Sequence, residues 1–204
     1  MPDAIPFLIV ALIVAVGAPL LIWAVRAEQA RDRRRQEAWS RWAGAHGFER
    51  VPYSGPWYRR QGERVRGTVE GLEFELFLHV VSTGETSVNY TKLRARGLPG
   101  EHPKLKLGAR GFATSCGRFF GLSYVECGDG EFDRRFAVRA GSREDMLEQL
   151  PEAARAALLS LGKRPYLNIA QGTAELYWIG AESDPAVLER ALAVIGALAP
   201  GRGR

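Results

Sequence analysis

The sequence predicts an α+β protein, in which a single N-terminal transmembrane helix is followed by one domain with a mainly antiparallel sheet and C-terminal helices. Three observations predict this fold class: an uncharged run at the N-terminus, β-rich segments joined by short turns, and amphipathic helical patterns near the C-terminus. The chain has 204 residues, of which 46% are hydrophobic and 25% are charged. This composition is typical of a globular protein and excludes a wholly disordered or collagen-like chain.

The uncharged run extends over 22 residues, from Ala4 to Val25. A helix of that length reaches roughly 33 Å, and the hydrocarbon core of a bilayer is about 30 Å thick. A cleaved signal peptide is the alternative, but residues 1–3 carry no positive charge and the run is longer than a signal core. We therefore expect residues 1–25 to form a transmembrane anchor.

Residues 26–46 form a basic segment, and we expect it to be a juxtamembrane helix. Six arginines and three acidic residues give this segment a net charge of +3. The positive-inside rule then predicts an inner-membrane, single-pass protein with its C-terminal domain in the cytoplasm. The residues expected at the membrane interface are Trp23, Arg26, Arg31, Arg33, Arg34 and Arg35.

The helix is expected to continue to about residue 46, where Gly47 ends it. Trp39 and Trp42 recur at helical spacing near its end, and we expect them to pack on the core of the domain.

Three β-rich segments then predict an antiparallel meander with strands at 65–69, 72–81 and 86–95. Glu70-Gly71 is expected to form the first turn. One set of alternating side chains in the middle strand should face the core: Leu72, Phe74, Leu76, Leu78 and Val80.

The C-terminal half predicts a second group of elements. The glycine-rich stretch 97–130 is expected to form short strands and loops, and 131–139 a strand. Helices are expected to begin at Ser142, Pro151 and Asp184, which are residues typical of helix starts. Two further strands are expected at 165–169 and 173–179, joined through Gln171-Gly172. We expect a single α+β cytoplasmic domain over 47–200 and a flexible tail over 201–204.

The charge of the chain is concentrated outside this domain. The formal net charge is +5, but residues 47–200 hold 20 basic and 19 acidic side chains. A nearly neutral domain does not favour nucleic acid as a partner. The expected partners are the membrane and a protein or an anionic lipid, and no cofactor is expected.

A short motif lies at Gly128, Asp129, Phe132, Asp133, Phe136 and Val138. It resembles the Gly-Asp-x-x-Phe-Asp-x-x-Phe-x-Val segment of an uncharacterised bacterial, often membrane-anchored family with a domain of unknown function. The resemblance covers about residues 108–180 and implies no established activity. From the residues themselves, we expect the three apolar side chains of the motif to enter the core and its aspartates to accept backbone hydrogen bonds.

Few residues in the chain predict catalysis. Cys116 lies near two arginines that would lower the pKa of its thiol, and Asp129 and Asp133 form a carboxylate pair. The usual hydrolase, phosphate-binding, dinucleotide and zinc motifs are absent from the sequence. Interleaved aromatic and basic residues predict one binding surface, made of Trp57, Tyr58, Arg59, Arg60, Arg64 and Arg66.

The function predicted from the sequence is a non-catalytic, membrane-tethered binding or interaction module in the cytoplasm. One alternative is an enzyme of unrecognised type that uses Cys116 or the Asp129/Asp133 pair. The other alternative is a structural membrane protein.

Overall fold

The computed structural model describes residues 4–52, 64–82, 84, 86–98, 104–110 and 123–199. The helices are α1 (Ala4–His46), α2 (Gly130–Arg135), α3 (Arg143–Gln149), α4 (Glu152–Ser160) and α5 (Pro185–Ala197). The strands are β1 (Glu49–Val51), β2 (Arg64–Val69), β3 (Leu72–Ser82), β4 (Ser87–Arg96), β5 (Leu105–Ala109), β6 (Ser123–Val125), β7 (Phe136–Ala140), β8 (Tyr166–Ala170) and β9 (Thr173–Ile179).

All described strands belong to one sheet with the order β1-β2-β3-β4-β9-β8-β5-β7-β6. Every pairing between these named strands is antiparallel. The predicted α+β class with a mainly antiparallel sheet is therefore confirmed. Two predicted hairpin turns are also present, because Glu70-Gly71 and Gln171-Gly172 each place two successive residues at positive φ, as a type I′ turn requires.

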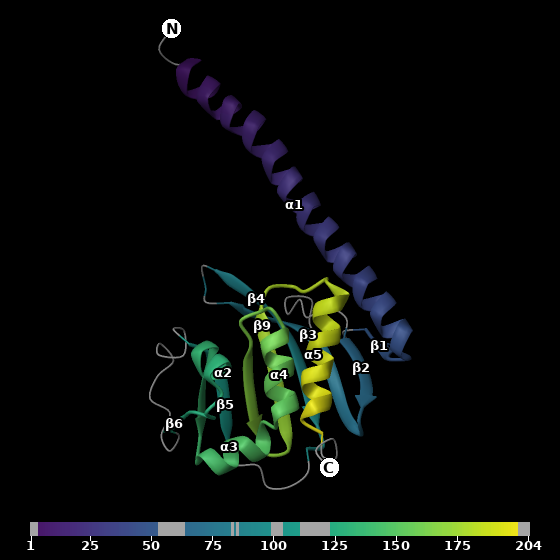
Figure 1. Ribbon diagram of the computed structural model, residues 1–204. Coiled ribbons are helices and arrows are strands. Elements are labelled where there is room, and N and C mark those ends of the chain that lie inside the picture. The colour runs from purple at the N-terminus through teal and green to yellow at the C-terminus, as the bar shows by residue number, and fades with distance from the viewer. Residues whose placement is uncertain are drawn as a thin grey trace.

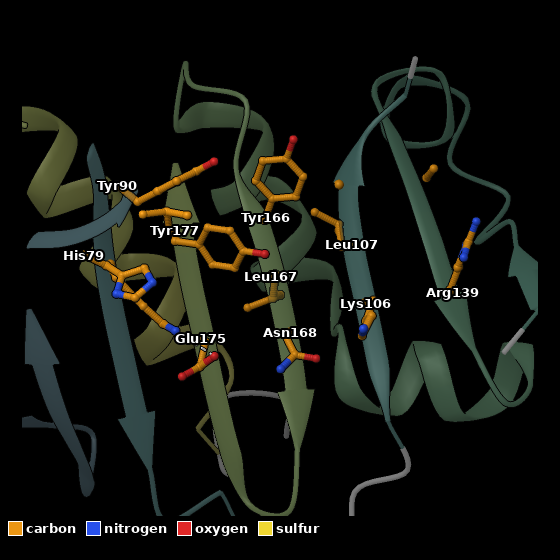
Figure 2. A pocket seen from close by; sticks show the side chains of 14 residues that line it. His79, Tyr90, Lys106, Leu107, Arg139, Tyr166, Leu167, Asn168, Glu175 and Tyr177 are labelled. Atoms are coloured by element: carbon orange, nitrogen blue, oxygen red, sulfur yellow. Dashed lines mark ion pairs between the residues drawn. The ribbon is translucent and has the colours of Figure 1, made fainter. Parts of the chain in front are cut away.

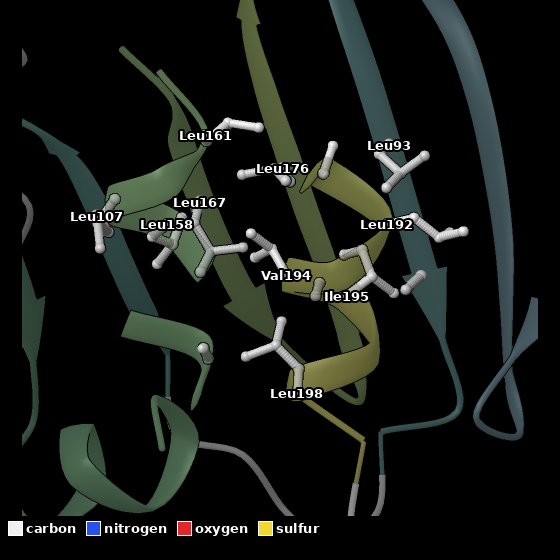
Figure 3. Close-up of a cluster of buried hydrophobic side chains, with 14 of the residues drawn as sticks. Leu93, Leu107, Leu158, Leu161, Leu167, Leu176, Leu192, Val194, Ile195 and Leu198 are labelled. Atoms are coloured by element: carbon white, nitrogen blue, oxygen red, sulfur yellow. The ribbon is translucent and has the colours of Figure 1, made fainter. Parts of the chain in front are cut away.

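Helices α2 to α5 cover one face of this sheet (Figure 1). Along β3, Leu72, Phe74, Leu76 and Leu78 are buried on that face, whereas Val80 is only partly buried. Figure 3 shows leucines of β4, β5, β8 and β9 facing side chains of α4 and α5, among them Val194 and Ile195. The apolar core therefore lies between the sheet and the helices, and none of the described helices covers the opposite face, which we call the open face.

The long helix α1 projects from the domain and contacts it through its last turns (Figure 1). Trp39 and Trp42 are each only 3% exposed, so the predicted packing of these tryptophans on the core is confirmed. The Trp39 indole donates to the backbone oxygen of Glu182 at 2.9 Å, and the Trp42 indole donates to a carboxylate oxygen of Glu189 at 2.8 Å. Buried indole N–H groups with partners fix the direction in which α1 leaves the domain.

The predicted transmembrane anchor is wrong, and so is the inner-membrane location that was inferred from it. Within the part of the chain that the structure describes, no helix combines the length and the apolar character that a bilayer crossing requires. A span needs about 20 apolar residues. Residues 1–3, and the side chains of residues 4–14 and of residue 16, lie outside the described part.

The predicted strand at 131–139 is also wrong in its first half. Residues 130–135 form helix α2, and the strand β7 begins only at Phe136. The reason is the N-cap at Asp129, which accepts two backbone hydrogen bonds from the first turn of α2. The acidic residues of α2 lie in its first turn and its arginines in its last turn, which is the arrangement that the helix dipole favours.

The remaining predicted elements agree with the structure to within a few residues. The side chain of Ser142 accepts a hydrogen bond from Asp145 N at 3.0 Å and caps α3, as the sequence predicted. Asp184 caps α5 in the same way, with Pro185 in the first turn. The expected tail, 201–204, lies outside the described residues.

Candidate functional site

One row of residues in register crosses the open face of the sheet from β1 to β6. Its members, in spatial order, are Glu49, Arg66, Glu75, Arg94, Glu175, Asn168, Lys106, Arg139 and Tyr124. Acidic and basic side chains alternate along the first five strands, and the alternation ends at Asn168. The open face therefore has two halves of different chemistry.

We call the first the paired half, which comprises the open-face residues of β2, β3, β4 and β9. Glu75 accepts hydrogen bonds from Arg64 at 3.0 Å and from Arg66 at 3.0 and 3.1 Å. Glu175 lies 2.9 Å from Lys92 Nζ and 2.8 Å from Arg94 Nε. Each carboxylate is thus held by two cations.

These contacts shift the pKa of both carboxyl groups. Burial alone would raise the pKa of Glu75, but hydrogen bonds from Arg64 and Arg66 outweigh burial and hold it below the ordinary value of a glutamate. Burial likewise opposes ionisation of Glu175, and Lys92 and Arg94 lower its pKa by more. Both groups are ionised at neutral pH.

We call the second the tyrosine half, which comprises the open-face residues of β8, β5, β7 and β6. The described sequences of these four strands contain no aspartate or glutamate. Their polar open-face side chains include Lys106, Arg139, Asn168 and the tyrosines 124 and 166. The Arg139 guanidinium lies over the Tyr124 ring at 4.5 Å and donates to its hydroxyl at 2.6 Å.

A groove of about 430 Å³ crosses the open face from β3 to β7 and joins the two halves (Figure 2). We call it the central groove. The side chains that line it are His79, Val81, Tyr90, Lys92, Lys106, Leu107, Ala137, Arg139, Tyr166, Leu167, Asn168, Glu175 and Tyr177, and Gly108 completes it.

The groove is hollow because of the sizes of its neighbouring side chains. Gly108 and Ala137 lie opposite each other on β5 and β7 and form a low floor. Tyr166 and Tyr177 lie opposite each other on β8 and β9 and form a wall, with their rings stacked at a centroid distance of 5.1 Å and an interplanar angle of 13°. Tyr90 meets the Tyr177 ring edge-on at 6.0 Å.

The groove is electropositive. Among the described residues that line it, three side chains are cationic, Lys92, Lys106 and Arg139, and one is a carboxylate, that of Glu175. Burial and the nearby cations Lys92 and Arg94 lower the pKa of His79, despite the opposing effect of Glu175, so its imidazole is neutral at pH 7.

A second hollow, of about 800 Å³, lies at the edge formed by β1 and β2. Arg64, Arg66, Arg94 and Arg96 contribute to it. The first three hold Glu75 or Glu175. The central groove combines cations with stacked tyrosine rings and an apolar floor, so it is the better candidate for a binding site.

The residues proposed for catalysis do not meet in this groove. The side chain of Asp129 caps α2, and Asp133 accepts hydrogen bonds from the backbone N–H groups of Cys127 and Gly128 at 3.0 and 2.9 Å. Both carboxylates thus stabilise the turn before α2. Burial raises the pKa of the Cys127 thiol, which donates to Asp133 at 3.3 Å, so this cysteine is a neutral thiol at pH 7. Cys116 lies outside the described residues.

The apolar members of the motif at 128–138 are buried in the core: Phe132, Phe136 and Val138. Among the described residues there is also no cluster of three or more His, Cys, Asp or Glu side chains that could hold a metal ion.

The basic surface predicted from the sequence is only partly described. Arg64 and Arg66 lie on β2 and hold Glu75, whereas residues 57–60 are outside the described part. Of the predicted membrane-interface residues, Trp23 is 70% exposed and Arg35 is 7% exposed. Arg35 pairs with Asp32 at 3.0 Å and lies over the Trp39 ring at 5.8 Å, so it supports the packing of α1.

The central groove was not predicted from the sequence. Its residues come from six strands, and each strand contributes a few alternating polar or aromatic side chains. A signal was present in the strands 165–169 and 173–179, where two tyrosines occupy outward positions together with Asn168 and Glu175. The sequence could not supply the order of the strands, which brings Lys106 beside Asn168.

No protein-family model matches this chain, and no curated protein matches it. The resemblance of the motif at 128–138 to an uncharacterised family therefore stays a prediction. A solved structure with a similar fold is the crystal structure of the mycobacterial trehalose monomycolate transport factor A, TtfA. It is 15% identical, the match covers 84% of this chain and 97% of that chain, and the TM-score is 0.52. At this identity the similarity shows a shared fold only.

Proposed function

We propose that this chain is a non-catalytic binding module and that the central groove is its binding surface. The observation that carries the proposal is the chemistry of the groove, which places stacked tyrosines, an apolar floor and several cations on a face that the helices leave open. A ligand bound there would be held by contacts on one side and remain accessible on the other.

The size and lining of the groove support binding of a ligand. Small-molecule sites typically have volumes of about 300–1,000 Å³ and combine apolar surface with a few polar groups that orient the ligand. The central groove, at about 430 Å³, falls within this range. Tyrosines favour binding because they present a large rigid surface and lose little conformational entropy.

The alternative of an enzyme has less support. A carboxyl group that acts as a catalytic acid or base must be free to exchange a proton near a substrate. Hydrogen bonds from Cys127 and Gly128 lower the pKa of Asp133, although burial opposes this, and they commit the carboxylate to the turn. The transport factor with a similar fold is named for transport, and a binding role for this chain is in keeping with that name.

Ligand-observed NMR screening of a mixed fragment library against the full chain would test the proposal. The matched variant is Ala137→Trp, which fills the floor of the groove and leaves the helix-covered face unchanged. The control is Ala153→Trp, at an exposed position of α4 on the other face of the molecule. Unfolding curves of both variants establish that they fold.

We expect fragments that bind the wild type and the control with millimolar or better affinity, and we expect their binding to be lost in Ala137→Trp. Fragments that bind the wild type and Ala137→Trp equally well would contradict the proposal, and so would a screen without any binder.

A further inference from the structure

We infer that the tyrosine-half end of the central groove binds a small organic oxyanion, a carboxylate or a phosphate ester attached to a ring. Lys106 and Arg139 would contact the oxyanion, and Tyr166 and Tyr177 would contact the ring. This inference rests on the proposed function, because it names the ligand class for the same groove.

The first argument is the juxtaposition of two cations. Lys106 and Arg139 are register partners on β5 and β7, so their Cβ atoms lie about 5 Å apart on one face of the sheet. Two cations in these positions can hold one oxyanion between them. The paired half shows the same solution built into the protein, where one carboxylate lies between two cations at Glu75 and again at Glu175.

The second argument is that Arg139 is held in place. Stacking of its guanidinium on the Tyr124 ring, with a hydrogen bond of 2.6 Å to the hydroxyl, restrains the side chain. A restrained guanidinium loses less entropy when it binds an oxyanion, and its planar fork suits two oxygens of a carboxylate or a phosphate.

The third argument is a buried polar atom in the groove. Asn168 lies between Glu175 and Lys106 in the register row. Its side-chain oxygen is buried and has no hydrogen-bond partner among the described residues. A buried amide without a partner costs free energy, and its oxygen and nitrogen ends are interchangeable by a half-turn. The half-turn would place the amide nitrogen where the oxygen now lies, and from there it can donate to an oxyanion held by Lys106.

The fourth argument concerns the body of the ligand. The floor at Gly108 and Ala137 leaves open the space beside the stacked rings of Tyr166 and Tyr177. A flat ring seated there would stack on or meet the edge of a tyrosine ring, as aromatic groups prefer. The volume of the groove suits a small molecule, so we assign this end to a compound with one ring and one oxyanion.

Isothermal titration calorimetry of the full chain with matched probes tests this inference. The oxyanion probes are phenyl phosphate and benzoate, and their neutral counterparts are benzyl alcohol and benzamide. Inorganic phosphate is the probe without a ring. The variants are Lys106→Gln, Arg139→Gln and Arg139→Lys, and the control is Arg66→Gln, which removes one positive charge from the paired half and leaves Arg64 to hold Glu75.

We expect phenyl phosphate or benzoate to bind at least about tenfold more tightly than the neutral counterpart, and phenyl phosphate more tightly than inorganic phosphate. Lys106→Gln and Arg139→Gln should each weaken oxyanion binding about tenfold, Arg139→Lys should weaken it less, and Arg66→Gln should leave it unchanged. Lys106→Gln removes a charge without touching the contact between Arg139 and Tyr124, so its effect reports on the ligand.

Several results would overturn the inference. Binding of the neutral probes with equal affinity would reject the oxyanion while leaving the groove as a binding site. Oxyanion binding that survives both charge-removing variants would place the site elsewhere. Absence of binding by all of these probes would reject this ligand class, and the fragment screen would then decide separately whether the groove binds anything.

Discussion

The two halves of the open face use cations in different ways. In the paired half, Arg64, Arg66, Lys92 and Arg94 surround two carboxylates, and three of them also lie over the ring of Phe77, at 5.3 to 6.0 Å. Phe77 is buried although it lies on the open face. In the tyrosine half, the described residues of β5, β6, β7 and β8 include Lys106 and Arg139 but no acidic residue.

We therefore assign different roles to the two halves of this surface, stability to the paired half and binding to the tyrosine half. In the paired half, the cations form ion pairs and cover the Phe77 ring, so they stabilise the fold. The tyrosine half places two cations opposite each other beside a hollow, where both can contact one bound anion. We therefore expect substitutions in the two halves to affect different measurements.

The largest expected effect on stability is that of Glu175→Gln. The change leaves Lys92 and Arg94 without their carboxylate partner in a partly buried position, so we expect the free energy of unfolding to fall by about 1–3 kcal/mol. Chemical denaturation at pH 7 measures this. The control is Glu73→Gln, at an exposed position of the same face, for which we expect a change within about 0.5 kcal/mol.

Equal losses for Glu175→Gln and Glu73→Gln would show that the ion pairs of the paired half contribute nothing to stability. The paired half would then not differ from the tyrosine half in its contribution to stability.

The next expected effect is a dependence of the free energy of unfolding on pH. The pKa values of Glu75 and Glu175 are lower in the folded chain than the ordinary value of 4.5, so their contribution is present above that value and is lost as the pH falls through the folded pKa. We expect the stability difference between wild type and Glu175→Gln to shrink as the pH is lowered from about 6 to about 3. Urea titrations at several pH values measure it, and a difference that stays constant with pH would contradict the prediction.

The paired half was partly visible in the sequence, whereas the tyrosine half was not. Alternation along 72–81 placed Leu72 and Phe74 in the core and Glu73 and Glu75 on the other face, because the side chains of a strand alternate with a fixed period of two. The hairpin turns also predicted which strands are neighbours, because two strands joined by a two-residue turn pair with each other.

The tyrosine half depends on pairings between strands that are distant in sequence. β5 lies between β8 and β7, and β4 pairs with β9, although many residues separate them along the chain. Local patterns do not contain this information. The error at α2 has a different and local cause, because the residues of 131–135 fit a strand pattern but the cap at Asp129 and the placement of charges favour a helix.

The smallest expected effect on stability is that of Lys106→Gln. Because the change removes repulsion from Arg139 across the strand pair, we expect the free energy of unfolding to stay within about 0.5 kcal/mol of wild type or to rise slightly. Thermal and chemical denaturation measure it. A loss of the size expected for Glu175→Gln would show that Lys106 serves the fold, and the two halves would no longer differ.

NMR mapping of phenyl phosphate on the full chain tests most directly whether the tyrosine half binds an oxyanion. We expect backbone amide shifts to change with the ligand mainly in three segments, 106–108 in β5, 137–139 in β7 and 166–168 in β8, and we expect Lys106→Gln to weaken these changes. Changes centred on Arg64 and Arg66 of the paired half, or spread over α1, would contradict this expectation.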